Sequence, residues 1–487
     1  MKLSELIKGV NVKNEINFDE DITNISRNSK EVTLKGLFFV INGENFDGYN
    51  YINDAVENGA TVIVTDRLTS IDVKQILVDD VILAMSKISY NFYKPKNKRV
   101  KLIGVVGTNG KTTTTYILKE ILCQAGKNVG VIGTLGISYN KHYIAPELTT
   151  PDSIELSRVL MEMADENVEY CVMELSAHAI SLKRADAFVF EELIFTNCTQ
   201  DHLDYFKTFD EYEKVKMSVF IKKYCKISIL NIDDKTGRKI LNFTNTQTLT
   251  YGLENPSDSF AVNVENSTKG VSFYMNVFDE IIKVDFSIFG TFNVYNCLAA
   301  ATAATAIGIS SKYIERGINS LKSVPGRLEY VEEYNGADIF VDYAHTPDGL
   351  LNTLKAVKSV CKNRVILVFG CGGNRDKDKR SKMGEIAGEY ADFTVITSDN
   401  PRYEEPYKII SQIECGIRSK TLSYITIQNR YIATGYAIEL LKKGDVLVVC
   451  GKGAENYQEI MGTKSHYNDK ETIQDVIAKI GLSGELI

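Results

Sequence analysis

The sequence lacks several features that would assign it to a broad class at once. Its nine cysteines contain no Cys-x-x-Cys pair, and their odd number and scattered positions are typical of reduced thiols in a cytoplasm rather than of a zinc site. The net charge of −7 gives no positive field for nucleic acid. No apolar run of about 18 residues is present, so no membrane span is expected. The first residues lack the apolar core of a signal peptide, so no export signal is expected.

What the sequence does contain is ordinary globular composition at considerable length. Hydrophobic residues make up 44% and charged residues 24% of 487 residues, which excludes the composition of a disordered chain. A chain of this length exceeds the size at which single cores stop growing. We find no internal repeat and no low-complexity tract. Several domains are therefore expected.

Short apolar runs separated by helix-like stretches predict an α/β fold in three domains. A small N-terminal domain is predicted over 1–98, ending at the basic, turn-prone segment 95–99. A central domain over 99–325 has the buried-strand pattern of a parallel nucleotide-binding sheet. After a turn near 323–327, a C-terminal domain over 326–487 repeats a Rossmann-like alternation. Its expected strands are 339–342, 365–369, 393–397 and 446–450.

The most specific local motif is a phosphate loop between the apolar strand 100–106 and the helix-like run 116–122. It reads Gly107-Thr108-Asn109-Gly110-Lys111-Thr112-Thr113. Glycines let backbone N–H groups approach phosphate oxygens, Lys111 can reach the outer phosphates, and Thr112 can ligate magnesium. Val105 occupies the position of the first glycine of the general P-loop, so this is a tighter GxxGKT variant. That variant, and the lack of an Asn-Lys-x-Asp guanine-reading motif, leaves a motor ATPase or switch GTPase only as a remote alternative.

Four further segments, together with this loop, resemble the Mur ligases along the whole chain. They are Leu148-Thr149-Thr150-Pro151-Asp152, Met173-Glu174-Leu175-Ser176-Ala177-His178, the Asn197…Asp201-His202-Leu203-Asp204 signature and Val341-Asp342-Tyr343-Ala344-His345-Thr346-Pro347. In addition, Asp399-Asn400-Pro401-Arg402 resembles the motif of the members that add meso-diaminopimelate. The resemblance implies a three-domain ATP-dependent ligase that activates a carboxylate as an acyl phosphate.

The resemblance also implies a catalytic set and a metal site. The catalytic residues would be Lys111, Glu174, His202 and Lys216. The Mg²⁺ ligands would be Thr112, Glu174, His202 and Lys216. Lys216 would carry a carbamate derived from CO₂, because an ammonium repels the ion whereas a carbamate offers two anionic oxygens. Composition alone cannot choose between Lys214 and Lys216, and only the resemblance selects Lys216.

Binding residues follow from the same resemblance. The ATP contacts would be Gly107, Thr108, Asn109, Gly110, Lys111, Thr112, Thr113, Asn296, Arg327 and Asp342. The UDP-substrate contacts would be Ser29, Thr149, Thr150, Ser176 and Arg184. The amino-acid contacts would be Arg380, Asp399, Asn400, Pro401, Arg402, Gly451 and Glu455. Two departures stand out: Asn28-Ser29-Lys30 replaces the usual Asp-Ser-Arg, and Ala454 replaces the histidine that usually precedes the glutamate.

The expected reaction joins meso-diaminopimelate to UDP-N-acetylmuramoyl-L-alanyl-D-glutamate with conversion of ATP to ADP and phosphate. Diaminopimelate has a second amino-acid head that lysine lacks, and the guanidinium of Arg402 suits its carboxylate. A lysine-adding ligase of the same type is one alternative. A catalytically weak paralogue that senses nucleotide or precursor is another, with Ala454 as its only sequence hint. The expected enzyme is a cytoplasmic monomer that binds neither nucleic acid nor membrane.

Overall fold

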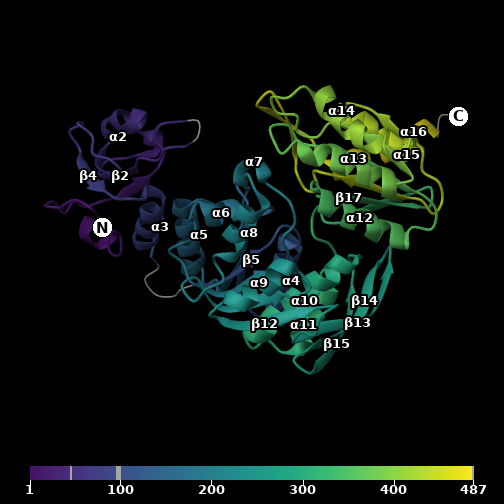
Figure 1. Ribbon diagram of the computed structural model, residues 1–487, viewed down its shortest axis with the longest axis horizontal. Helices are drawn as coiled ribbons and strands as arrows, with labels where there is room; N and C mark the ends of the chain where they lie inside the picture. The colour runs from purple at the N-terminus through teal and green to yellow at the C-terminus, as the bar shows by residue number, and fades with distance from the viewer. Residues whose placement is uncertain (44–45, 95–99, 485–487) are drawn as a thin grey trace.

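The computed structural model describes residues 1–43, 46–94 and 100–484, and its three main sheets confirm the predicted α/β class (Figure 1). The N-terminal sheet lies at one end, the large central sheet occupies the middle, and the C-terminal sheet lies at the other end. The predicted segment 95–99, where the first domain was expected to end, lies outside the described residues. The second predicted boundary, at 325/326, falls between α11 (Ser311–Ser320) and β16 (Glu329–Tyr334).

The N-terminal part is a four-stranded parallel sheet in the order β1-β2-β3-β4. Its strands are β1 (Asn24–Ser26), β2 (Gly36–Phe39), β3 (Ala60–Thr65) and β4 (Lys74–Leu77), and its helices are α1 (Leu3–Leu6), α2 (Ile52–Glu57) and α3 (Val81–Phe92). Leu37 and Phe39 on one face and Phe38 and Val40 on the other are buried, so both faces of β2 are covered. This explains why the run is apolar at every position rather than at alternate ones.

The central part is an eleven-stranded sheet in the order β15-β14-β13-β12-β11-β10-β5-β9-β6-β7-β8. Its middle strands are parallel: β5 (Lys101–Val106), β6 (Val129–Gly133), β9 (Tyr170–Glu174), β10 (Phe190–Phe195), β11 (Cys225–Asn231) and β12 (Gln247–Gly252). Antiparallel pairs extend both edges through β7 (Gly136–Tyr139), β8 (His142–Ile144), β13 (Ser259–Ser267), β14 (Gly270–Val277) and β15 (Glu280–Phe286).

Helices cover both faces of this sheet. One face packs against α4 (Lys111–Gln124), α10 (Thr291–Ala306) and α11. The other face and its margins carry α5 (Ser153–Asp165), α6 (Ala177–Ser181), α7 (Leu203–Phe206), α8 (Phe209–Met217) and α9 (Lys235–Phe243). Burial on both sides explains the unbroken apolar pattern of β5 and β10, which the sequence analysis took as the pattern of a parallel sheet.

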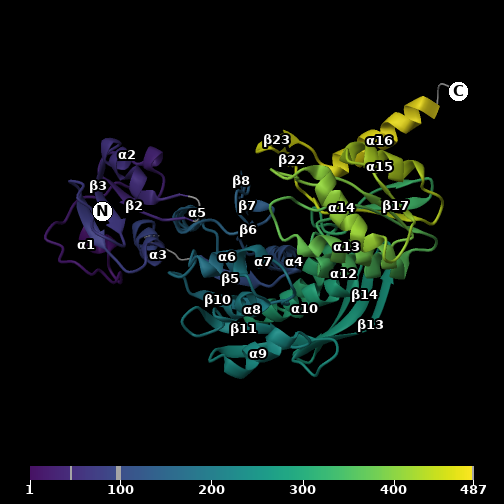
Figure 2. The same cartoon turned by 45° about the horizontal axis from the view of Figure 1, so that its top comes forward.

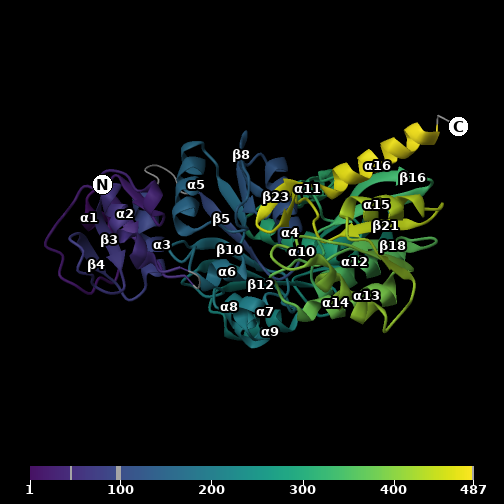
Figure 3. The ribbon, with the colours of Figure 1, turned by 90° about the horizontal axis from the view of Figure 1, so that it is seen from above.

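The C-terminal part is a six-stranded sheet in the order β16-β17-β21-β18-β19-β20, parallel except for β16. The strands after β16 are β17 (Ala337–Asp342), β18 (Val365–Phe369), β19 (Phe393–Ile396), β20 (Tyr424–Thr426) and β21 (Val446–Cys450). Helices α12 (Pro347–Val360), α13 (Asp378–Tyr390) and α14 (Pro406–Ile417) lie on one face, and α15 (Arg430–Glu439) and α16 (Asp469–Gly484) on the other (Figure 3). A hairpin of β22 (Tyr457–Ile460) and β23 (Thr463–His466) projects toward the side of the central sheet that carries β8 (Figure 2).

The three parts meet at interfaces of different kinds. Phe289 of the central part stacks edge-on against Phe340 of β17, with ring centroids 5.1 Å apart inside one continuous apolar cluster. The N-terminal part packs α3 against α5, and Arg27 forms an ion pair with Asp152 at 2.7 Å. The carboxyl ends of β5, β9 and β10 open toward the C-terminal part. In open α/β sheets ligands bind at such strand ends, so this junction is where a site is expected.

Candidate active site

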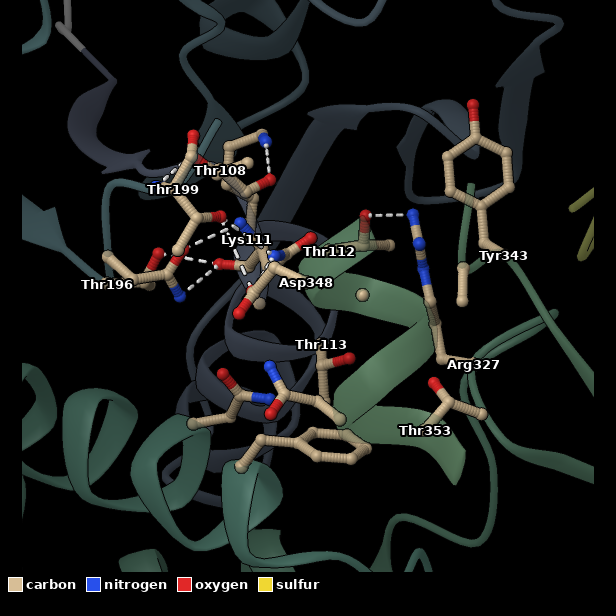
Figure 4. Close-up of a pocket in the computed structure, with 18 of the residues that line it drawn as sticks. Thr108, Lys111, Thr112, Thr113, Thr196, Thr199, Arg327, Tyr343, Asp348 and Thr353 are labelled. Atoms are coloured by element: carbon tan, nitrogen blue, oxygen red, sulfur yellow. Dashed lines mark hydrogen bonds between the residues drawn. The ribbon is translucent and has the colours of Figure 1, made fainter. Parts of the chain in front are cut away.

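A cavity of about 620 Å³ lies at this junction (Figure 4). Its walls come from the phosphate loop, the ends of β9 and β10, the start of α10 and the start of α12. Of the residues predicted to be functional, those that line it are Thr108, Asn109, Gly110, Lys111, Thr112, Thr113, Thr149, Glu174, Ser176, His202, Asn296, Arg327 and Asp342. The structure thus places together most of the predicted ATP and catalytic residues, which are scattered over the sequence.

The phosphate loop is held in shape by contacts that exclude larger residues. Gly110 caps α4 with φ +85°, and a Cβ there would lie 2.4 Å from Oδ1 of Asn296. At Gly107 a Cβ would lie 1.8 Å from Oγ1 of Thr196. The Thr196 hydroxyl in turn donates to the carbonyl of Asn109 at 2.7 Å. Both glycines are therefore required by close packing, and the N-terminus of α4 is left facing the cavity.

Lys111 is bound to the loop that precedes it. Its Nζ donates to the carbonyl oxygens of Gly107 and Thr108, each at 2.9 Å. Burial lowers the pKa of this ammonium group, and Glu174 opposes the effect. The side chain thus lies at the helix N-terminus, the position from which it can reach the outer phosphates.

Glu174, the last residue of β9, connects the phosphate loop to the end of the neighbouring strand β6. Its Oε1 accepts from the Thr112 hydroxyl at 3.0 Å and from the Thr134 amide at 2.8 Å. Arg327 of the C-terminal part donates to the same Thr112 hydroxyl at 2.8 Å, as the dashed line in Figure 4 shows. Oε2 of Glu174 accepts from the Thr134 hydroxyl at 3.1 Å. A carboxylate has about four acceptor positions, so Glu174 keeps about one of them, on Oε2, for a cation.

His202 lies on the loop after β10, with φ +54°. Its Nε2 is 3.3 Å from Asp201, and its ring meets that of His178 edge-on at 4.8 Å. Burial lowers the pKa of His202 well below its usual range, although Asp201 opposes the shift. The imidazole is therefore neutral at physiological pH, which is the form that a metal ligand requires.

Lys216 and Lys214, which composition could not distinguish, have opposite environments. Lys214 is exposed, whereas the Lys216 side chain is buried on α8 and donates to the Thr108 hydroxyl at 2.7 Å. Its Nζ lies 4.0 Å from the centre of the Tyr212 ring. Burial lowers the pKa of Lys216 to about 7. A substantial fraction of this amine is therefore neutral and nucleophilic near pH 7.

The protein donors near Thr112 do not by themselves enclose an ion. Within the described part of the chain, no three histidine, cysteine, aspartate or glutamate side chains converge as a metal site. The hydroxyl of Thr112, the Glu174 carboxylate and the neutral His202 nevertheless border one cavity. Such oxygen-rich donors, with positions left for phosphate oxygens and water, are what Mg²⁺ prefers.

The end of the cavity near β17 and α12 contains predicted and unpredicted residues. Asp342 accepts from the amides of Leu328 and Ala344 and from the Thr353 hydroxyl, and thereby shapes the turn at the end of β17. Asp348, which follows the Val341–Pro347 motif, accepts from the Asn109 amide at 2.7 Å and was missed. Phe292, Tyr295 and Ala356 form the apolar wall of this end and were also missed.

A second polar cluster lies at the carboxyl ends of β19 and β21. Asn400 donates to the Glu455 carboxylate at 3.0 Å, and Asp399 lies 2.6 Å from where a Cβ on Gly451 would be. Arg402 contacts the carbonyl of Gly373 at 2.8 Å and keeps 20% of its side chain exposed. The carbonyl oxygen of Pro401 lies close to Gly373, and a Cβ at Gly373 would be 1.9 Å from that oxygen. The structure therefore brings together Asp399, Asn400, Pro401, Arg402, Gly451 and Glu455.

Arg380 does not fit the role that the sequence analysis expected. Its side chain is fully buried, and its two terminal nitrogens donate to Glu404, Gln412 and Gly372. Arg375, five positions earlier, is exposed on the loop before α13, and its Cγ is 3.9 Å from where a Cβ at Gly372 would lie. Its charge is also close enough to His178 of the central part to lower that pKa, although burial is the larger cause. Exposure, which the sequence pattern does not report, distinguishes the two arginines.

The predicted sugar-nucleotide contacts form a line from the cavity toward the N-terminal part. Thr150 donates to the carbonyl of Glu174 at 2.9 Å, and Arg184 donates to the carbonyl of Thr150 at 2.7 Å. Ser176 caps α6 and lies 3.3 Å from Thr150. Thr149 lies 3.3 Å from Thr134. Ser29 is buried in the N-terminal part, outside the cavity.

Comparisons with known proteins agree with this arrangement. Three family models match the chain: the catalytic domain of the Mur ligase family over residues 21–109, the Mur ligase middle domain over 105–304 and the glutamate ligase domain of Mur ligases over 326–453. The chain belongs to the Mur ligase family, whose members are ATP-dependent enzymes that form amide bonds.

Individual relatives and solved structures show which members of the family the chain resembles. The chain is 43% identical to UDP-N-acetylmuramoyl-L-alanyl-D-glutamate–2,6-diaminopimelate ligase 1 of Clostridium acetobutylicum, covering 99% of this chain and 100% of the relative. It is 40% identical to the ligase of the same name, without the number, in Caldanaerobacter subterraneus, covering 98% and 99%. A solved structure of a ligase of that name superposes with a TM-score of 0.72 at 27% identity, over 99% of each chain. The MurF ligase of Thermotoga maritima in complex with ADP shares the fold, with a TM-score of 0.63 at 22% identity over 94% and 97% of the two chains.

The geometry of Gly110 generates the first prediction. Gly110→Ala is expected to weaken ATP binding at least about tenfold, because the new methyl would contact Asn296 and deform the loop. Gly126→Ala is the matched control, since Gly126 has φ +74° and nothing within 4 Å of a Cβ. Both variants carry the same left-handed strain of about 1–2 kcal/mol. Calorimetric titration with ATP checks this, and equal ATP affinity in the two variants contradicts it.

Proposed function

We propose that the chain is the ligase that joins meso-diaminopimelate to UDP-N-acetylmuramoyl-L-alanyl-D-glutamate and converts ATP to ADP and phosphate, a step of peptidoglycan precursor synthesis. The observation that carries this is the pairing of an ATP-type cavity with the separate cluster of Asn400, Arg402 and Glu455. The relatives at 40–43% identity, which carry this ligase's name, support the same assignment. Carboxylate activation and acceptor binding thus each have a candidate site in the molecule.

In this proposal the carboxylate of the dipeptide is activated in the cavity. Lys111 and the N-terminus of α4 hold the phosphates of ATP, and Arg327 approaches the same region from the C-terminal part. The carboxylate attacks the γ-phosphorus, ADP leaves, and an acyl phosphate forms. The amine of the acceptor then attacks the acyl carbon and expels phosphate. Because the reacting groups are anions, positive charge in a partly buried site supplies much of the stabilisation.

We infer that Mg²⁺ is held by Thr112, Glu174, His202 and a carbamate on Lys216. When bound, the ion screens the charge of the phosphates and of the attacking carboxylate. The support for the carbamate is that Lys216 is buried beside Thr108 and is partly neutral near pH 7. A neutral amine can attack the carbon of CO₂ and release one proton, which gives the anionic group that an ion requires. Lys214 is exposed and offers no such site.

The acceptor is assigned to the cluster in the C-terminal part. The Glu455 carboxylate, which accepts from the Asn400 amino group, offers acceptors for an ammonium group. Arg402, whose Nε pairs with Glu459 at 3.4 Å, has further guanidinium donors for a carboxylate. Arg375 takes the place of Arg380 as the proposed contact to the acceptor carboxylate. The terminal nitrogens of Arg380 already donate to Glu404, Gln412 and Gly372. Two arginines near one another suit an acceptor with a second carboxylate, which lysine lacks. The alternatives are a lysine-adding ligase and a weak precursor-sensing paralogue.

The setting of the enzyme follows from the same proposal. Among the described residues, no helix has the length and apolar character needed to cross a bilayer. We propose a cytoplasmic monomer whose substrates are the UDP-muramoyl dipeptide, ATP and meso-diaminopimelate. Closure of the domains over bound substrates would exclude water from the acyl phosphate.

Release of ADP by the purified protein tests the function. The assay supplies ATP, Mg²⁺ and the UDP-muramoyl dipeptide with meso-diaminopimelate, L-lysine or no amino acid. Turnover is expected only with diaminopimelate, because Arg402 and Arg375 match its second head. Turnover only with lysine would keep the ligase chemistry and overturn the specificity. No turnover with either, together with binding of ATP or the dipeptide, would favour the sensor.

Replacement of Lys216 tests the carbamate. Lys216→Ala is expected to lose most ligase activity, at least about a hundredfold, and short carboxylates in the buffer should restore part of it because they can occupy the vacated position. Lys214→Ala is the control and should keep wild-type activity. In the wild type, carbamate occupancy at fixed CO₂ should rise between pH 6 and 8, as the amine loses its proton. Full activity of Lys216→Ala would remove the carbamate from the mechanism.

Variants of Arg375, on the loop before α13, and of Arg380, within α13, test which arginine contacts the acceptor. Arg375→Ala is expected to raise the KM for diaminopimelate about tenfold or more and to leave thermal stability unchanged, because its side chain is exposed. Arg380→Ala should instead lower thermal stability, since it leaves the Glu404 carboxylate without its buried partner. Steady-state kinetics and thermal unfolding of both variants decide between the assignments. A stable Arg380→Ala enzyme with a raised KM would restore the original expectation.

A further inference from the structure

One buried lysine, Lys452, lies directly behind the acceptor cluster. It follows Gly451 at the end of β21, and its side chain is fully buried. Its Nζ donates to Oδ1 of Asn400 at 2.9 Å and to the carbonyl of Tyr457 at 2.8 Å. It also lies 3.4 Å from the carboxylate of Glu455. The Lys452 ammonium group thus contacts both Asn400 and Glu455 of the acceptor cluster.

These contacts determine how Asn400 presents its amide. Oδ1 of Asn400 accepts from Lys452 and from the Glu459 amide at 3.0 Å, which identifies it as the oxygen. The Asn400 amino group must then point the other way, and it donates to Glu455 at 3.0 Å. Lys452 therefore orients Glu455 twice, once directly and once through Asn400. A lysine with three donors is suited to this role, because the three acceptors surround it.

Lys452 also separates the roles of two neighbouring carboxylates. Asp399 lies 3.8 Å from Lys452, and although burial opposes the effect, Lys452 and Arg430 hold the pKa of Asp399 below its usual range. Only 10% of the Asp399 side chain is exposed, whereas Glu455 keeps 24% exposed. Asp399 is thus charged but enclosed behind the pocket. Glu455 is the carboxylate that an incoming ammonium group can reach.

A second buried ion pair anchors the strand that carries Lys452. Arg430 donates to both oxygens of Asp469 at 2.8 Å and to the carbonyl of Cys450 at 2.9 Å, and neither charged side chain is exposed. Cys450 is the last residue of β21, two positions before Lys452. The first residue of α16 therefore fixes the backbone from which Lys452 extends. The position of the lysine is set by the fold rather than by the ligand.

We propose that Lys452 is a positioning residue for the acceptor amino acid: it holds Glu455, directly and through Asn400, in the position that receives the ammonium group and keeps Asp399 from competing for it. This inference rests on the proposed function, because it assumes that Glu455 binds the ammonium group of the acceptor. It does not involve the ATP cavity, which Lys452 does not line. Loss of Lys452 should therefore affect acceptor binding and leave carboxylate activation intact.

The test separates these two halves of the reaction. Acyl phosphate formation is measured as hydroxamate, with hydroxylamine in place of the amino acid, and ligation is measured as tripeptide formed at varied diaminopimelate. Lys452→Met is expected to raise the KM for diaminopimelate at least about tenfold, with the hydroxamate rate and the KM for ATP within about twofold of wild type. Lys452→Arg keeps the charge and should restore part of the KM.

Arg364→Met is the matched control for general loss of stability. It removes a cation from the buried Asp445 carboxylate at the opposite ends of β18 and β21, far along both strands from Lys452. Its KM for diaminopimelate should stay at the wild-type value. If Lys452→Met does not fold, Lys452→Arg carries the test, with a KM raised severalfold and an unchanged hydroxamate rate.

An unchanged KM for diaminopimelate in the Lys452 variants overturns the inference, and so does a parallel loss of hydroxamate and tripeptide. The same KM increase in Arg364→Met also overturns it, because the effect would then be one of stability. Failure of the proposed function looks different, since the wild type would then form neither hydroxamate nor tripeptide.

Discussion

The hydroxyl of Thr112 is the atom on which the assembly of the site depends. It donates to Glu174 at the end of β9 and accepts from Arg327 of the C-terminal part, so two sheets are tied to the start of α4 through one oxygen. Serine would keep these bonds, but any residue without a hydroxyl would break both. The phosphate loop, the carboxylate and the arginine therefore take their positions together, and a disturbance of one is transmitted to the other two.

Much of this could be predicted from the sequence because the signals are local. Unbroken apolar runs such as Val365–Phe369 predict strands covered on both faces, and the structure has β18 there. The glycine loop between a strand and a helix predicts a phosphate site, since backbone N–H groups and the helix N-terminus act without help from distant residues. For the same reason, the order of the three sheets along the chain could be predicted from the local alternation of apolar strand-like runs with helix-like stretches.

What could not be predicted depends on the third dimension. Arg375 and Arg380 have the same chemistry and are five positions apart, and only burial of Arg380 against Glu404 separates them. Asp348 approaches the phosphate loop from another domain, a contact between residues 239 positions apart. Lys214 and Lys216 were indistinguishable by composition for the same reason, since one turn of α8 faces both solvent and core. A sequence pattern gives residue types, whereas the choice between these residues depends on the burial and contacts of each side chain.

The two interfaces of the central part differ in how they respond to solvent. The C-terminal part shares an apolar cluster with it, including the contact of Phe289 with Phe340, and apolar contacts are insensitive to moderate salt. The N-terminal part is joined by the packing of α3 against α5, by the ion pairs of Arg27 with Asp152 and of Lys183 with Asp80, and by the edge-on contact of Tyr90 with Phe188. At physiological ionic strength exposed charges are screened over about 8 Å. In the proposed function, the end of the molecule that would receive the bulky nucleotide sugar is thus held in part by ion pairs that salt weakens, while the end that would receive the small acceptor shares a continuous apolar core with the central sheet.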